Sequence, residues 1–224
     1  MSKRSEELSR CNGMPVYETG DMEFKTYGRV LDGYDFSTLV SYMEDQTAIP
    51  ESGNVYLPSV TDMENEPVKA HVEQSLYGGM PVQIGYCNGR NNTYNGFEWH
   101  KGSEINIAVT DFMLVLGHTW DIVDKQYRAE QAEVFFVPKG TAIEMYQTTL
   151  NLSPCRTSDD GFKDIVILPQ GTNTSLQEKE TPVDEEGALL LMRNKWVIAH
   201  PDREPLIRQG AYAGMIGENK ELFY

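Results

Sequence analysis

The chain has 224 residues, of which 40% are hydrophobic and 24% charged, so a single globular domain is expected and wholesale disorder, collagen and coiled coil are excluded. Its 34 acidic residues outnumber 19 Lys and Arg, which gives a formal net charge of −15. Because nucleic-acid affinity comes mostly from clustered Lys and Arg, this balance argues against nucleic acid and anionic membranes as partners.

The chain begins with a polar segment of mixed charge, and no stretch approaches the roughly 18 consecutive apolar residues of a membrane span. Its three cysteines form no CxxC pair, and an odd number suits free thiols in a reducing compartment. We therefore expect a cytoplasmic protein. Residues 1–23 are expected to form a loose leader, followed by a single domain at 24–224.

The first elements expected in the domain are a short strand at 24–31 and two helices. The first helix is expected at 36–46, where Ser37 or Thr38 can cap it, and a shorter one at 68–76. From residue 80 onward, short apolar or alternating runs separated by Gly, Asn and Asp predict a series of strands: 80–86, 97–100, 104–109, 112–116, 132–137, 141–152, 164–168, and a hairpin formed by 189–192 and 195–199. This spacing favours a mainly β fold, an antiparallel sandwich or barrel rather than βαβ units. The polar segment 174–187 is expected to be a surface loop.

The segment from Phe97 to Glu104 is the strongest candidate for a chemical site. On a strand, Glu98 and His100 point to the same side, and a turn at 101–103 would bring Glu104 beside them. Nitrogen and carboxylate ligands that converge in this way suit a divalent ion such as Zn, Mn, Fe or Ni. The structural alternative is that Glu98 and His100 are exposed edge residues while Trp99 packs in the core.

A second candidate segment follows the apolar strand at 132–137. Pro138-Lys139-Gly140 forms a turn, after which Glu144 and Tyr146 would share one face of the next strand. That face either lines a cavity or is solvated. His118, just after Gly117, is a third candidate ligand, although a lone His beside a turn is more often a packing or surface residue.

The order of these two segments resembles the cupin superfamily, whose motifs are G(x)5HxH(x)3–4E(x)6G and G(x)5PxG(x)2H(x)3N. Glu98-Trp99-His100 followed by Glu104 matches the HxH(x)3E part, with Glu in place of the first His. Pro138-Lys139-Gly140 matches PxG, but Ile143 stands where the second motif has its His, and Glu144 is the substitute one place later. The phrases Trp99-His-Lys-Gly-Ser-Glu-Ile-Asn and Val137-Pro-Lys-Gly-Thr-Ala also resemble the bacterial cupin-like family DUF4867.

The resemblance implies a cupin-type antiparallel β-barrel or jelly roll with one or two N-terminal helices, one divalent metal ion in the barrel mouth, and a homodimer. It leads to the prediction of a metal-dependent isomerase or epimerase of a small sugar or sugar acid, in which the ion polarises a carbonyl and a carboxylate moves a proton. The roles expected are metal ligands His100, Glu104 and Glu144; catalytic residues Glu98 and Lys101; and substrate-binding residues Trp99, Tyr146 and Lys139. Two alternatives remain open: a non-catalytic sugar-binding or sensing module, and an iron-dependent oxygenase or lyase on the same barrel.

Overall fold

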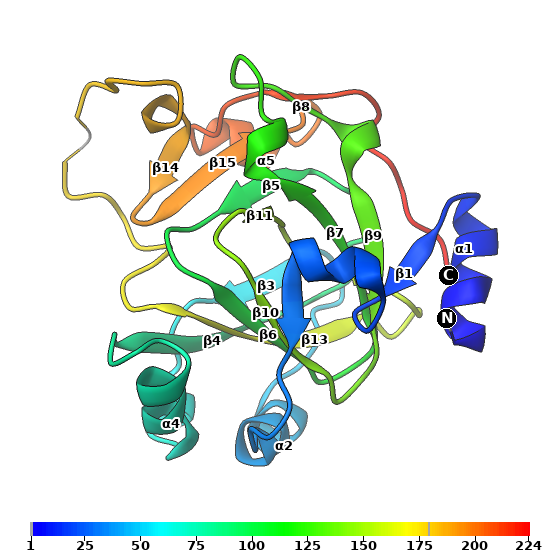
Figure 1. The fold of residues 1–224 in the computed structure, drawn as a ribbon, viewed down its shortest axis with the longest axis vertical. Helices are drawn as coiled ribbons and strands as arrows, with labels where there is room; N and C mark the ends of the chain where they lie inside the picture. The colour runs from blue at the N-terminus through cyan, green and yellow to red at the C-terminus, as the bar shows by residue number, and fades with distance from the viewer. Residues whose placement is uncertain (1, 179) are drawn as a thin grey trace.

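The computed structural model describes residues 2–178 and 180–224, and its centre consists of two packed β-sheets (Figure 1). The larger sheet has six strands in the order β2-β10-β6-β13-β4-β3: Gly28–Val30, Ala142–Met145, Glu104–Ala108, Phe162–Pro169, Val82–Gly89 and Asn54–Leu57. The second has β1 (Val16–Glu18), β9 (Glu133–Val137), β7 (Phe112–His118) and β11 (Thr149–Leu150), with β12 (Cys155–Arg156) also on β7. Apart from the parallel pair β1–β9, neighbours in both sheets are antiparallel.

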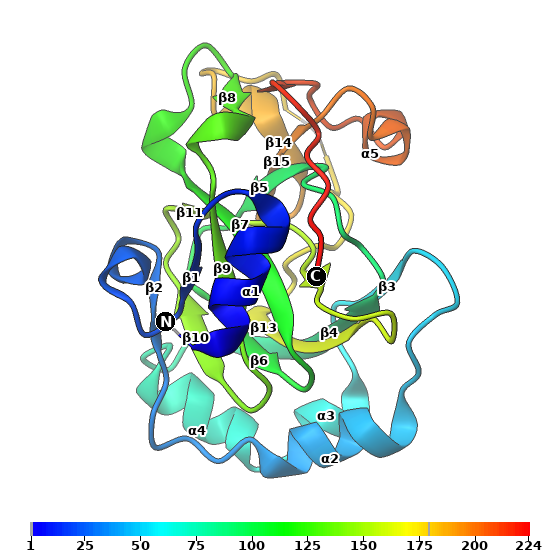
Figure 2. The same ribbon diagram turned by 90° about the vertical axis from the view of Figure 1, so that its right-hand side faces the viewer.

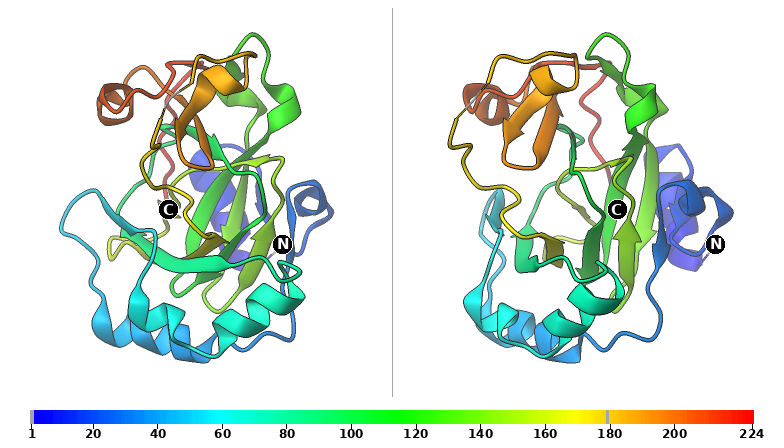
Figure 3. Two further views of the ribbon diagram at one scale, coloured as in Figure 1. Left: turned by 90° about the vertical axis from the view of Figure 1, so that its left-hand side faces the viewer. Right: turned by 60° about the vertical axis from the view of Figure 1, so that its left-hand side comes forward.

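A smaller sheet covers one end of this arrangement. The hairpin of β14 (Leu190–Met192) and β15 (Lys195–Ala199) pairs through β15 with β5 (Gly96–Trp99). The hairpin lies at the opposite end of the molecule from helices α2 (Ser37–Gln46), α3 (Thr61–Glu64) and α4 (Val68–Ser75) (Figure 3). Further elements are a parallel pair, β8 (Tyr127–Arg128) with β16 (Met215–Ile216), helix α5 (Glu204–Arg208), and the 3₁₀ turns η1 (Met22–Thr26), η2 (Thr119–Asp121), η3 (Ala129–Gln131) and η4 (Gly187–Leu189).

The alternation of side chains on β6 divides the core into two layers. Ile105 and Ile107 pack with Leu39, Met43 and other apolar side chains of the three helices, which cover the outer face of the larger sheet (Figure 2). Ala108 packs on the opposite face, among aromatic and aliphatic side chains of the second sheet. Glu104 and Asn106 share the Ala108 side of the strand, so the sequence of β6 directs polar groups into the space between the sheets.

Most elements predicted from the pattern are present. The helices expected at 36–46 and 68–76 are α2 and α4, and the expected mainly β, antiparallel class is confirmed. The hairpin expected at 189–199 is present, with Asn194 in the left-handed conformation (φ 54°) at its turn. The strand expected at 24–31 is reduced to β2, because η1 occupies its first residues.

The N-terminal segment differs from the loose leader expected at 1–23. It contains helix α1 (Lys3–Asn12), capped by the Ser2 hydroxyl, which accepts a hydrogen bond from the Ser5 amide. It also contains β1, which extends the second sheet beyond β9, and Leu8 and Val16 are fully buried. Burial of Leu8 and Val16 and the pairing of β1 with β9 therefore hold this mostly polar segment against the rest of the fold. None of the described helices is both long and apolar enough to cross a membrane.

Candidate functional site

Two residues of the segment Phe97–Glu104, Glu98 and Glu104, line a cavity of about 160 Å³. Six strands contribute polar or titratable side chains to its lining, among them Cys87 from β4, Glu98 from β5, Glu104 from β6, Asp164 from β13 and Lys195 from β15. The other lining residues are Asn54, Tyr56, Leu152, Ser153, Pro154, Val166 and Leu168. Residues spread over more than one hundred positions of the sequence therefore meet in one small polar cavity.

His100 lies just behind this cavity, between two carboxylates. Its Nε2 is 3.4 Å from Glu104 Oε2 and 3.6 Å from Glu98 Oε1, and only 2% of the residue is exposed. The turn between β5 and β6 makes this possible, since Gly102 has φ +124° and an added Cβ there would lie 2.8 Å from the Pro169 ring. The predicted convergence of these three side chains is present.

Charge within the cluster is balanced by a lysine. Lys195 Nζ lies 2.5 Å from Glu98 Oε2, and both side chains are largely buried. Burial alone would raise the pKa of Glu98, but Lys195 and His100 lower it to about 2. Burial likewise disfavours protonated His100, but Glu104 and Glu98 outweigh it and raise the pKa of His100 to about 9. The cluster therefore combines two carboxyl groups, Glu98 and Glu104, with two cationic groups, His100 and Lys195.

A buried amide network fixes Glu104 in place. Asn106 Nδ2 donates to Glu104 Oε1 and to Asp164 Oδ2, each at 3.1 Å, and Asn151 Nδ2 lies 3.5 Å from Glu104 Oε2. Burial, together with the nearby Glu104 carboxylate, raises the pKa of Asp164 well above its ordinary value. The Asn106 amide thus joins the carboxyl groups of Glu104 and Asp164.

The donor chemistry beside His100 suits a divalent ion. Nδ1 of His100 donates to the Asn194 carbonyl at 2.7 Å, so Nε2 is the nitrogen that could bind an ion, after release of its proton; the buried Nε2 has no hydrogen-bond partner among the described residues. Ligand atoms of a tetrahedral ion with bonds of about 2.0–2.2 Å lie roughly 3.4 Å apart, close to the Nε2–Glu104 separation.

A complete set of protein ligands is not assembled, however. Across residues 2–178 and 180–224, no three or more His, Cys, Asp and Glu side chains are arranged so that they could hold an ion. The third candidate, Glu98, has its carboxylate engaged by Lys195. His100 and Glu104 therefore offer two ligand atoms at a suitable spacing, and Glu98 is held by its lysine.

Glu144 does not belong to this site. In the register of β10 with β6, Glu144 is opposite Ile105, which places it on the helix-facing side of the sheet, and it pairs with Arg29 at 2.7 Å. The neighbouring Ile143 is the residue that points inward, and it is fully buried among apolar side chains. The substitution of Glu144 for the motif histidine is therefore wrong, because a shift of one residue on a strand exchanges its faces.

Four other predicted residues also lie outside the cavity. Lys101 is half exposed and its Nζ contacts Glu186 at 2.6 Å; Trp99 points to the opposite side of β5 from Glu98 and donates from Nε1 to the same Glu186 at 3.1 Å. Lys139 pairs with Glu44 on the surface at 2.8 Å. Tyr146 follows β10 and is absent from the cavity lining. The proposed roles of these residues in the site are not supported by their positions.

His118, the optional further ligand, is held in an aromatic stack. Its ring lies between those of Tyr27 (4.1 Å) and Trp120 (4.0 Å), and its Nε2 is 3.3 Å from Thr26 Oγ1. Burial lowers its pKa. This is the packing role that a lone histidine beside a turn usually has.

Lys195, Asp164 and Asn106 were not among the predicted site residues. Asn106 had a usable signal, since it is two residues after Glu104 on the same predicted strand and must share its face. Lys195 and Asp164 lie on predicted strands as well, but their proximity to Glu98 and Glu104 depends on the pairing of β15 with β5 and of β13 with β6. Local periodicity carries no information about such long-range pairing.

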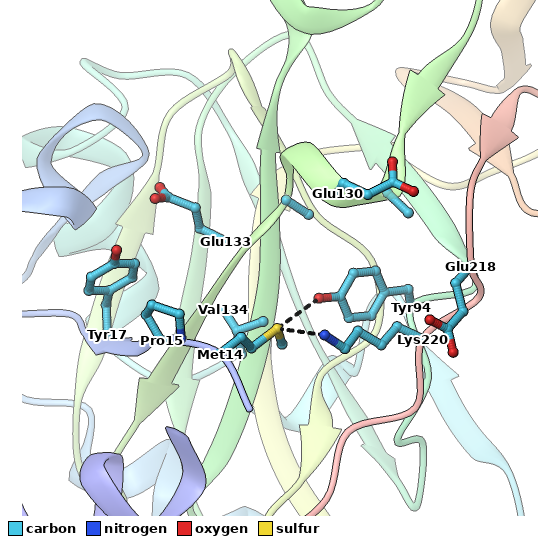
Figure 4. A pocket seen from close by; sticks show the side chains of 11 residues that line it. Met14, Pro15, Tyr17, Tyr94, Glu130, Glu133, Val134, Glu218 and Lys220 are labelled. Carbon is cyan, nitrogen blue, oxygen red and sulfur yellow. Dashed lines mark hydrogen bonds between the residues drawn. The ribbon is translucent and has the colours of Figure 1, made fainter. Parts of the chain in front are cut away.

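A cavity beside the N-terminal segment is separate from this site. It has a volume of about 360 Å³ and lies on the outer side of the second sheet. Met14 Sδ is at its centre and receives contacts from Lys220 Nζ (3.0 Å) and Tyr94 OH (3.9 Å), with Glu130, Glu133 and Glu218 around the rim (Figure 4). It contains no predicted site residue, and its carboxylates are separated from one another rather than convergent.

The fold and cavity together define a mainly β protein in which strands of the larger sheet and of the smaller sheet line a cavity that holds a cluster of charged acid–base groups. The chain belongs to the family described as a domain of unknown function, DUF4867, whose model matches residues 16–220 and so includes part of the expected leader. The family assignment made from the two motif segments is confirmed. No curated protein matches the chain.

Several solved structures resemble part of the fold. A salicylate 1,2-dioxygenase from Pseudoaminobacter salicylatoxidans has 13% identity over 58% of this chain and 30% of its own, with a TM-score of 0.31. Oxalate decarboxylase from Bacillus subtilis, which has Mn(II) centres, has 8% identity over 43% of this chain and 24% of its own, with a TM-score of 0.30. The 11S globulin from Wrightia tinctoria has 12% identity over 55% of this chain and 27% of its own, with a TM-score of 0.34. The chain spans less than a third of the length of each.

Proposed function

We propose that the cavity is the active site of a metal-dependent isomerase or epimerase that acts on a small sugar or sugar acid. The observation that carries the proposal is the buried group of Glu98, His100, Glu104 and Lys195, in which two carboxylates and two cationic groups meet beside a cavity of about 160 Å³. Such concentrations of perturbed titratable groups in a cavity are typical of acid–base catalysis. The small volume favours a substrate smaller than a drug-sized ligand, whose sites usually measure about 300–1,000 Å³.

In this proposal His100 and Glu104 hold the divalent ion, taken from Zn, Mn, Fe or Ni. When bound, the ion acts as a Lewis acid that polarises the substrate carbonyl. The amide of Asn106 holds Glu104 Oε1 in position, and the Asn194 carbonyl fixes the His100 ring so that Nε2 is the available nitrogen.

Glu98 is the proposed base for the C–H next to the carbonyl. In the free protein its pKa is about 2, too low for an effective base, because Lys195 neutralises it. When Lys195 donates instead to the developing enolate oxygen, Glu98 loses its counter-cation and becomes more basic. In an isomerisation, Oε2 then moves the proton from one carbon to the neighbouring carbon, while Lys195 gives a proton to the carbonyl oxygen and recovers one from the adjacent hydroxyl group. An epimerisation instead requires return of the proton to the opposite face of the same carbon. Lys195 thus takes the role expected for Lys101.

A non-catalytic sugar-binding module is the second candidate, and the Lys195–Glu98 ion pair favours it. A cavity whose charges already neutralise one another can bind polar hydroxyl groups without an ion or a base. In both cases a small carbohydrate is the proposed partner. A homodimer, which rests on the cupin resemblance, and a cytoplasmic location, which rests on the sequence, remain proposals.

Proton exchange with solvent provides the test. The protein, loaded with each divalent ion in turn, is incubated in D₂O with a panel of aldoses, ketoses and sugar acids, and deuterium at the carbon next to the carbonyl is followed by NMR. The proposal predicts exchange on at least one substrate, reduced by about 100-fold or more in Glu98→Gln. Glu144→Gln is the matched control and should retain the wild-type rate. Binding of a sugar without any exchange would instead support the second candidate.

A further inference from the structure

A second cavity, of about 340 Å³, lies on the other side of β5 from the candidate active site. Trp99 reaches it because side chains on β5 alternate, so that Glu98 faces one cavity and Trp99 the other. The cavity is lined by Trp99, Thr119, Trp120, Ile122, Lys125, Glu185, Glu186 and Leu189. None of these residues has a role in the proton transfer proposed above.

Trp120 forms a rigid aromatic platform at this cavity. It is 61% exposed, although one face of its indole is stacked on the His118 ring at 4.0 Å with an interplanar angle of 15°. His118 in turn is stacked on the buried Tyr27 at 4.1 Å and 8°. The stack fixes the Trp120 rotamer and leaves its other face uncovered. A ligand that covers this face would therefore lose little side-chain entropy on binding.

A fixed carboxylate lines the same cavity. Glu186 Oε1 accepts hydrogen bonds from Trp99 Nε1 at 3.1 Å and from Lys101 Nζ at 2.6 Å. Lys101 also lies over the Trp196 ring, 5.1 Å from its centroid, so both donors are themselves packed. Two donors on one oxygen orient the carboxylate and leave Oε2 available to a ligand hydroxyl group.

The geometry points to a second binding site, for an uncharged saccharide that stacks a ring on Trp120 and donates hydroxyl hydrogens to Glu186. The weakly positive C–H face of a sugar ring complements the negative face of an indole. Lys101 pairs with Glu186, and the lining contains one further lysine, Lys125, and one further glutamate, Glu185, so the formal charges sum to zero and the site has no net charge to select an ionic ligand. The volume is at the lower end of the roughly 300–1,000 Å³ range of small-ligand sites, which fits one or two sugar rings. This inference is independent of the proposed reaction.

Calorimetric titration of the full chain tests the site, with glucose, galactose, lactose, maltose and cellobiose as probes. We expect at least one probe to bind, and Trp120→Ala to weaken that binding by about tenfold or more. Val123→Ala is the matched control, since Val123 is 65% exposed nearby but does not line the cavity, and it should bind as the wild type does. Circular dichroism establishes that each variant is folded, and Trp120→Phe, which keeps a ring, should retain part of the affinity.

A Glu98→Gln/His100→Ala double variant separates this site from the candidate active site. It should retain the Trp120-dependent binding even if all proton exchange is lost. The inference is overturned if no probe binds the wild type, or if binding is insensitive to Trp120→Ala. It is also overturned if Trp120→Ala instead converts a dimer to a monomer in sedimentation while leaving sugar binding intact, because the exposed indole would then be a contact between two copies of the chain.

Discussion

Lys195 and Glu98 form an ion pair in the interior, with 2.5 Å between Nζ and Oε2 and only 13% and 12% of the two side chains exposed. β15 and β5 bring them together, since the two strands pair antiparallel with Val197 opposite Glu98. In this pair, the positive charge of Lys195 neutralises the negative charge of Glu98 inside the cavity. Its response to substitution is therefore informative about both stability and chemistry.

Removal of the lysine should destabilise the fold. Lys195→Met leaves the Glu98 carboxylate buried without its cation, and we expect the free energy of unfolding to fall by about 3–5 kcal/mol. Urea denaturation at pH 7 measures this. Lys101→Met is the control, since its pair with Glu186 is exposed and should contribute no more than about 1 kcal/mol. A loss in Lys195→Met no larger than in the control would contradict the account.

Because the pKa of His100 is raised, the free energy of unfolding should fall at alkaline pH. Its folded pKa is raised to about 9 from an ordinary value of 6.5, so its contribution is complete below about pH 6.5 and is lost as the pH rises through 9. The shift corresponds to a contribution on the order of 3 kcal/mol. Urea denaturation at pH 6, 7.5 and 9, with a chelator present, should show the decline in the wild type. In His100→Gln the decline should be smaller, and parallel curves for the two proteins would refute the assignment.

The three thiols should differ sharply in reactivity. Cys11 is exposed, whereas Cys87 and Cys155 are buried, and burial raises the pKa of each of these two to about 12. A thiol reagent at pH 8 should therefore modify one cysteine per native chain and all three in denaturant. Peptide mass spectrometry identifies the modified residue. Rapid native modification of Cys87 would mean that the cavity is much more open than the structure indicates.

Substitution of two glutamates from the predicted motifs should affect ion binding differently. Glu104→Gln removes one of the two proposed ligands and should weaken binding of a divalent ion by about tenfold or more. Glu144→Gln should leave the affinity unchanged, because Glu144 pairs with Arg29 on the helix-facing side of the sheet. Competition with a chromophoric chelator measures both. Equal losses in the two variants would require β10 to have a different register.

The candidate site could be predicted only as far as local geometry extends. Alternation on a strand and a glycine turn were sufficient to bring together Glu98, His100 and Glu104, which lie within seven consecutive residues. Lys195 is on a strand almost one hundred positions away, and its place beside Glu98 follows from sheet pairing that no local pattern encodes. The error at Glu144 has the same origin, since its face depends on the register with β6.

The fold shows the same limit. Repeated short strands with turn residues between them were sufficient for the mainly β class, and helical spacing was sufficient for α2 and α4. Helix α1 was missed because most of its residues are polar and it has no strong apolar stripe. It is stabilised instead by the burial of Leu8 against the second sheet. Propensity and periodicity do not report such tertiary contacts.

Elemental analysis of the purified protein, beside its His100→Ala/Glu104→Ala double variant, tests the central claim most directly. Both are reconstituted with Zn, Mn, Fe or Ni and then freed of loosely bound ion by gel filtration. The account predicts about one divalent ion per wild-type chain and none in the double variant, with Glu144→Gln equal to the wild type. An ion retained by the double variant, or no ion in the wild type under any of the four conditions, would contradict a metal site at His100 and Glu104.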